Sequence, residues 1–309
     1  MKPSIRPAAR PKNGGGTAPI SLFEHWNKRP KSSPELERSL ADLQRLARER
    51  PDLAGPANHL GALLSVAFAD TEPEVLPQTD QAEMAKGWSS GRPAFQVRPL
   101  RLDASRIKKR FGRLVQRFPP KIKLTKGFLE TIHSRRSEIE EWVAQILVGC
   151  PGEVVRRASS LGVDPSWLLS TLRIAILPSL AKVSLLLDRS RPEGLWDQGD
   201  CPNCGSPPLF AESRGLEQRI FFRCGLCAAD WAGERLCCPA CTEHRSHSLR
   251  IEYVDGEQEK CRLVHCHSCR YHWRVVSTLT PLSAPEMIVA DLATIHLELI
   301  FDESRARPD

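Results

Sequence analysis

Four C-x-x-C pairs lie between Cys201 and Trp273, and they constrain the fold more than any other feature. Two sulfurs three positions apart can face one tetrahedral metal when the backbone turns tightly between them. A second pair from another turn then completes the ligand shell. The pairs are Cys201/Cys204, Cys224/Cys227, Cys238/Cys241 and Cys266/Cys269. The sequence therefore predicts two four-cysteine metal sites in series.

The two predicted sites look like copies of one unit. Each unit opens with C-P-x-C and closes with C-x-x-C-x-x-x-W, so that Trp231 ends the first unit and Trp273 ends the second. Gaps of nineteen residues after Cys204 and twenty-four after Cys241 suit a short hairpin, and alternating runs at 219–223 and 249–254 predict strands. Two complete copies favour sequential pairing, first pair with second and third with fourth. The alternative is an interleaved ribbon that joins the first pair to the third.

Four thiolates saturate a tetrahedral metal and leave no position for water or substrate. Such a site is structural or transfers single electrons. Zinc would be inert and iron could change oxidation state, and the ligands alone do not choose between them. Because no catalytic triad, phosphate-binding loop or dinucleotide fingerprint is visible, the chain is predicted not to be an enzyme. Clustered pairs favour metal over disulfides, hence a reducing compartment, and we expect a cytoplasmic protein.

Two further cysteines in this stretch, Cys237 and Cys261, stand outside the pairs. They are either incidental buried thiols or reserve ligands with a redox role. Five histidines also lie here, and we expect them to support the sites or to lie on the surface. They are His244, His247, His265, His267 and His272.

The net charge of +7 is uneven, because eleven Lys or Arg and one acid occur between Arg98 and Lys126. This run either binds an anionic partner, which would be a nucleic-acid backbone or an acidic protein, or forms the solvated face of a helix. The second interpretation follows from apolar residues at helical spacing between the cations. They are Ile107, Phe111, Leu114, Val115 and Phe118. Residues 201–280 hold ten Lys or Arg against nine Asp or Glu, so nucleic acid is not an expected partner of the metal region.

Residues 1–20 are predicted to be a disordered leader, and 21–190 an all-helical domain. Within it we expect helices at 34–50, 58–68 and 104–118, one long helix at 125–148, and a helix from Pro165 that is interrupted at Pro178. Two metal units follow, at 191–236 and 237–280, and a C-terminal helix and tail at 281–309. The apolar face of that last helix is expected to hold Ile288, Leu292, Ile295 and Leu299. The apolar run 167–187 contains Arg173, Pro178 and Lys182, so no membrane span is expected.

The cysteine segment resembles the formate dehydrogenase accessory protein family (FdhE). The resemblance rests on CPNCGSPP at 201–208, C-x-x-C-x-x-x-W at 224–231, Arg235-x-x-Cys238-x-x-Cys241, the pair Cys266/Cys269, and the helix 289–298. It covers 201 to about 300, whereas the preceding helices are similar only in kind. The chain departs from the family pattern at Ala232 and at Ala290.

The resemblance implies an α+β fold with two tandem rubredoxin-like or zinc-ribbon units, in which the eight paired cysteines bind two tetrahedral ions, with iron preferred and zinc the alternative. It also implies a maturation role. The protein would be a metal-binding chaperone that contacts the catalytic subunit of formate dehydrogenase before export or assembly. A zinc-ribbon nucleic-acid-binding protein is the alternative function.

Overall fold

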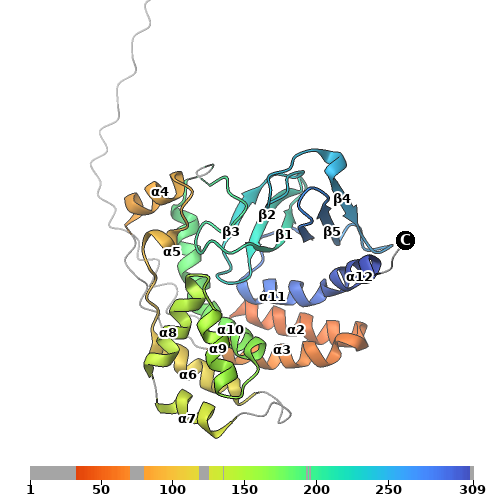
Figure 1. The fold of residues 1–309 in the computed structure, drawn as a ribbon. Coiled ribbons are helices and arrows are strands. Elements are labelled where there is room, and N and C mark those ends of the chain that lie inside the picture. Colours follow the sequence, from red (N-terminus) through yellow and green to blue (C-terminus); the bar gives the residue numbers. More distant parts are fainter. Residues whose placement is uncertain are drawn as a thin grey trace, which may run out of the picture.

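A computed structural model describes residues 33–69, 80–117, 125–134, 136–192, 194 and 196–306 (Figure 1). The predicted leader at 1–20 lies outside the described residues, as does Phe118. The remaining chain has a helical N-terminal part, strands around both cysteine groups, and helices at the C-terminus, so the predicted fold class is confirmed. The proposed domain boundaries at 190, 236 and 280 stay a prediction.

The N-terminal helices begin where capping residues allow. Ser33 accepts a hydrogen bond from the Leu36 amide, and Asp103 and Asp164 cap two later helices in the same way. The α-helices are α2 (Pro34–Glu49), α3 (Ala54–Ala67), α4 (Gln81–Ser89), α5 (Ala94–Val97), α6 (Ala104–Val115), α7 (Lys126–Ser134), α8 (Arg136–Leu147), α9 (Gly152–Ser160) and α10 (Pro165–Ser190).

The chain after the basic helix contains α7, α8 and α9. The expected helix at 125–148 corresponds to α7 and α8, which lie on either side of residue 135, a position outside the described part of the chain. Helix α9 was not predicted. Pro151 stands at its start, and Val154 and Ala158, one turn apart, are fully buried.

The prediction that the helix is interrupted at Pro178 is wrong, because α10 continues through this residue. Proline lacks an amide donor and weakens the turn before it. Arg110 of α6, which is 1% exposed, donates hydrogen bonds to the Ala175 carbonyl at 2.6 Å and to the Ser179 hydroxyl at 3.2 Å. The guanidinium thus supplies hydrogen bonds to the turn that the proline weakens.

Helix α6 agrees with the helical interpretation of the basic run. Ile107, Phe111, Leu114 and Val115 are buried as predicted, and Arg110 points inward with them. Residues 104–115 of the run therefore form an amphipathic helix with one cation, Arg110, in the core.

Among the described residues, α10 alone is long and apolar enough to cross a membrane by length and composition. However, 61% of its most apolar window is buried by the rest of the chain, which is typical of a core helix.

Both metal units contribute to one six-stranded sheet in the order β3-β2-β1-β6-β5-β4. The strands are β1 (Pro208–Arg214), β2 (Arg219–Cys224), β3 (Asp230–Gly233), β4 (Leu249–Glu252), β5 (Cys261–Cys266) and β6 (His272–Thr278). Neighbours are antiparallel except β1 and β6, which pair in parallel from Ala211↔Val275 to Arg214↔Thr278. This single parallel pairing joins the first unit to the second. The strands predicted at 219–223 and 249–254 correspond to β2 and β4.

The two faces of the sheet have different surroundings. One face packs on the C-terminal helices α11 (Ala284–Ala293) and α12 (Ile295–Ala306), which lie between the sheet and α2–α3 (Figure 1). Arg274, with a side chain 3% exposed, holds this layer together by donating to the carbonyl and carboxylate of Asp291 and to the Thr294 hydroxyl, and by an ion pair with Glu298. We call the opposite side, on which Trp273 and Val275 lie, the outer face.

The prediction of a single C-terminal helix is wrong, because Thr294 separates α11 from α12. Its expected apolar face is also wrong in part: Leu299 is 57% exposed, while Met287, Val289, Leu297 and Phe301 are buried. The predicted capping box is present, with Glu286 accepting from the Ser283 amide at 2.8 Å.

Candidate metal centres

The structure gathers the eight paired cysteines into two groups of four. Within each group the sulfur atoms all lie within 4.8 Å of one another. The first group is Cys201, Cys204, Cys224 and Cys227, and the second is Cys238, Cys241, Cys266 and Cys269. This is the sequential pairing, not the interleaved ribbon.

All four C-x-x-C turns share one backbone geometry. In each, the amide of the fourth residue after the first cysteine donates to that cysteine's carbonyl, as Gly205 does to Cys201 at 2.8 Å. That fourth residue has a positive φ in every turn: Gly205 +76°, Ala228 +58°, Thr242 +56° and Arg270 +64°. The sequence indicated this requirement only at Gly205, because the other three positions are not glycine.

The sulfur atoms lie in contact across each group. Cys201 Sγ is 3.5 Å from Cys227 Sγ, and Cys204 Sγ is 3.4 Å from Cys224 Sγ. In the second group Cys238 Sγ is 3.6 Å from Cys269 Sγ, and Cys241 Sγ is 3.7 Å from Cys266 Sγ. These separations suit four thiolates around one tetrahedral ion.

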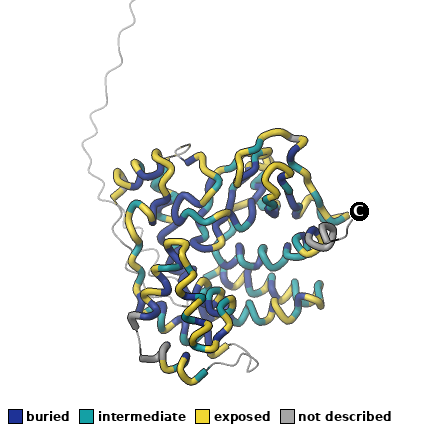
Figure 2. The backbone as a smooth tube through the Cα atoms, in the orientation of Figure 1, coloured by how far each residue is buried: buried dark blue, intermediate teal, exposed yellow. Residues whose placement is uncertain are grey.

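The first group is enclosed by the helical part of the chain. The Trp88 indole donates to the Pro202 carbonyl at 2.9 Å, and the amides of Ala94 and Phe95 donate to the carbonyls of Pro202 and Asn203 at 2.8 Å. All four of its cysteines are buried, and buried residues continue from the helices into this turn (Figure 2). The helices therefore hold the first cysteine turn directly, which the sequence did not indicate.

Burial also sets the electrostatics of the first group. It raises the pKa of the Cys201 and Cys227 thiols, because a lone thiolate is poorly solvated there. The amides of Leu226 and Cys227 each donate to Cys224 Sγ at 3.4 Å. Four thiolates in this space need a cation to balance them, which a divalent or trivalent ion would provide.

The second group is more open. Cys238 and Cys266 are buried, whereas Cys241 and Cys269 are exposed. The donor set is the same four sulfurs, so both groups fit a closed tetrathiolate site. A ligand exchanging with solvent would reach the second group first.

The two unpaired thiols each lie beside a carboxylate and an imidazole. Cys237 Sγ is 3.8 Å from His244 Nε2, which lies near Glu234. Cys261 is near Glu257 and His296. Neither thiol is in a four-cysteine group. The sequence identified both cysteines but not these groupings, and His296 comes from a distant segment, helix α12.

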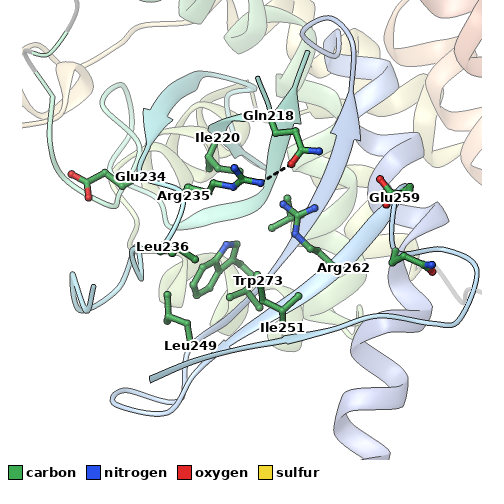
Figure 3. A pocket seen from close by; sticks show the side chains of 13 residues that line it. Gln218, Ile220, Glu234, Arg235, Leu236, Leu249, Ile251, Glu259, Arg262 and Trp273 are labelled. Atoms are coloured by element: carbon green, nitrogen blue, oxygen red, sulfur yellow. Dashed lines mark hydrogen bonds between the residues drawn. The ribbon is translucent and has the colours of Figure 1, made fainter. Parts of the chain in front are cut away.

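A cavity of about 210 Å³ opens on the outer face, between the two units (Figure 3). The guanidinium groups of Arg235 and Arg262 lie along one side of it, and Trp273, Leu236 and Leu249 lie along the other. Arg235 donates to the Gln218 side-chain oxygen at 2.7 Å. Burial and the charge of Arg235 lower the pKa of Arg262, and the charge of Glu259 partly offsets this. Because Glu234 and Glu259 also line the cavity, an anionic group would bind beside the two guanidinium groups, next to the apolar side chains.

Two matches to known proteins bear on the family of this chain. The chain is 32% identical over 120 residues to a protein named "Protein FdhE homolog" from Stutzerimonas stutzeri (strain A1501), an alignment that spans 38% of each chain. The crystal structure of the FdhE protein from Pseudomonas aeruginosa superposes with a TM-score of 0.61 at 20% identity, covering 87% of this chain and 91% of that one. The resemblance to the FdhE family is confirmed. The first match supports it in sequence, and the second shows the same fold as FdhE over most of the chain. No family model matches the chain.

Proposed function

We propose that this chain is an accessory protein for the maturation of a formate dehydrogenase. It would act in the cytoplasm, without catalytic activity of its own, and contact the catalytic subunit before export or assembly. The observation that carries the proposal is the pair of four-cysteine groups on the FdhE fold. The sequence similarity to an FdhE homolog supports the same role.

We assign one tetrahedral metal ion to each four-cysteine group, with iron preferred over zinc. Because four thiolates leave no open position, the ions would stabilise the sheet or transfer single electrons, and would not hydrolyse a substrate. Metal analysis of protein expressed with iron should find about two ions per chain, in agreement with one per group. Ferric tetrathiolate iron gives visible charge-transfer bands, whereas zinc gives a colourless protein. A preparation that binds neither metal would contradict the assignment.

The outer face is the surface that we assign to the catalytic subunit. The opposite face of the sheet is covered by α11 and α12, whereas the outer face carries the cavity with Arg262. Ile251 and Leu236 at its rim are 47% and 49% exposed. An acidic segment of the catalytic subunit with apolar neighbours would complement this surface.

Co-purification tests the contact. A tagged chain should retain the catalytic subunit, and Arg262→Glu should reduce the amount by at least about tenfold, since a like charge then faces the acidic segment. Arg48→Glu on the exposed side of α2 is the matched control and should retain it. Equal retention by both variants would exclude the outer face.

Deletion of the chain's gene tests the role itself. Formate oxidation should fall, and reintroduction of the wild-type chain should restore it. Unchanged formate oxidation together with no co-purified dehydrogenase subunit would contradict the accessory role. Salt-dependent binding to nucleic acid would instead support the zinc-ribbon alternative.

A further inference from the structure

The two four-cysteine groups leave Cys261 unused, and its surroundings hold two other metal-ligating side chains. Cys261 Sγ is 3.8 Å from Glu257 Oε2, and the same carboxylate oxygen is 2.8 Å from His296 Nε2. One ligand atom from each of the three residues lies within 4.8 Å of the other two. We propose that Glu257, Cys261 and His296 form a third metal site, for a zinc-class divalent ion.

Three separate elements hold this cluster in place. Glu257 belongs to the turn between β4 and β5, where its carbonyl accepts from the Cys261 amide at 3.0 Å. Cys261 begins β5 on the face that packs against the C-terminal helices, and His296 comes from α12. Leu263, Leu297 and Phe301 form one buried apolar cluster with Cys261. The ligands are therefore positioned by packing before any ion binds.

The donor set matches a borderline divalent ion in chemistry and in charge. One sulfur, one imidazole nitrogen and one carboxylate oxygen are all zinc ligands. A thiolate and a carboxylate balance the charge of a divalent cation, and the thiol proton leaves to solvent when the sulfur binds. Burial first, and then the charge of Glu257, raises the pKa of Cys261 to about 11, and the charge of Lys260 offsets this only in part, so a cation bound at the sulfur would stabilise the thiolate.

Burial distinguishes this cluster from the one around Cys237. The side chains of His296 and Glu257 are 13% and 34% exposed, whereas those of His244 and Glu234 are 59% and 74% exposed. Exposed side chains lose more conformational freedom when an ion fixes them. Furthermore, His296 Nδ1 is buried and accepts or donates no hydrogen bond among the described residues. The imidazole is thus not fully satisfied by its contact with Glu257.

The site would differ from the four-cysteine groups in one chemical respect. Three protein ligands leave a tetrahedral ion one position for water or an external ligand, whereas four thiolates leave none. Lys260 interacts electrostatically with Cys261 and Arg50 with Glu257, and Arg50 is bound to Asp52 at 3.0 and 3.2 Å. The inference does not depend on the proposed accessory function, because it needs only these three side chains.

Cobalt titration tests the site in the full-length chain after both four-cysteine groups are loaded with zinc. A further equivalent of Co²⁺ should bind and give a thiolate-to-cobalt charge-transfer band of one sulfur. Cys261→Ser and His296→Gln should each weaken this binding by at least about tenfold, which is about 1.4 kcal/mol. Cys237→Ser is the matched control and should bind the further equivalent as the wild type does.

Zinc retained in the four-cysteine groups shows that each variant is folded, and His296→Gln decides the result if Cys261→Ser does not fold. No further equivalent in the wild type overturns the proposal. Retention of that equivalent in both Cys261→Ser and His296→Gln also overturns it, and its loss in Cys237→Ser alone assigns it to the other cluster.

Discussion

At the scale of single residues, Asp188 links the end of α10 to the first metal unit. Its carboxylate accepts from Arg191 at 2.9 Å, from the Asn203 side chain at 3.1 Å and from the Asp230 amide at 3.3 Å. Burial, partly offset by Arg191, raises its pKa to about 6. Because the folded-state pKa lies above the unfolded value, the protonated form stabilises the fold, and this contribution is lost as pH rises through about 6.

The effect of Asp188 should be visible against a variant that cannot ionise. Between about pH 5 and about pH 8, the wild type should lose about 1 kcal/mol of unfolding free energy relative to Asp188→Asn. Urea unfolding of both proteins with metal bound measures this difference, and changes common to both, such as metal release at low pH, cancel. If the unfolding free energy of the wild type instead rose relative to Asp188→Asn as the pH increases, the raised pKa of Asp188 would be contradicted.

The cysteine turns make a second prediction at this scale. Arg270 is exposed and has φ +64°, a conformation that costs a non-glycine residue about 1–2 kcal/mol. Arg270→Gly should therefore raise the unfolding free energy by about 0.5–1 kcal/mol. Arg250→Gly, at an exposed position of β4, should lower it by a similar amount, because strands disfavour glycine. Thermal unfolding of the metal-loaded proteins compares them, and a loss of stability in both would refute the strain argument.

At the scale of elements, Arg110 and Pro178 act together across α6 and α10. Removing the guanidinium removes the hydrogen bonds that it donates to the Ala175 carbonyl and to the Ser179 hydroxyl. Arg110→Met should cost about 2–3 kcal/mol of unfolding free energy. The exposed neighbour Lys109→Met should change it by about 0.5 kcal/mol at most.

A double-mutant cycle measures the coupling between these two helices. In a Pro178→Ala background the amide of residue 178 is restored, so the turn depends less on Arg110, and Arg110→Met should cost less there by about 1 kcal/mol. Additive effects in the cycle would show that the arginine does not compensate for the proline.

These helices also show where sequence reasoning reaches its limit. The apolar spacing of 104–115 predicted a helix and its buried side correctly, because the pattern is local. The pattern cannot reveal that Arg110 points inward, since its hydrogen-bond partners lie 65 and 69 positions away. The same limit applies to Pro178, because the arginine that binds its turn comes from another helix.

At the scale of the whole molecule, the cysteine spacing predicted both groups and their sequential pairing. The joining of the two units into one sheet through β1 and β6 was not predicted, because parallel pairing of strands that far apart leaves no local pattern. The enclosure of the first group by α4 and α5 was likewise beyond the sequence. As a result the two groups, alike in ligands, differ in burial: the first has four buried cysteines and the second has two.

This asymmetry predicts the order in which the proposed metal ions are lost. A chelator in solution reaches exposed Cys241 and Cys269 directly, whereas the first group opens only when the helices move away from Pro202 and Asn203. Metal release should therefore follow two phases of equal amplitude. The rate of the slow phase should be lower than that of the fast phase by about tenfold or more, which corresponds to an activation barrier higher by about 1.4 kcal/mol. Cys266→Ser should lack the fast phase and Cys224→Ser the slow one, because each empties one group and leaves the other loaded. A single phase in the wild type, or loss of the fast phase in Cys224→Ser, would contradict both the order and the independence of the two centres.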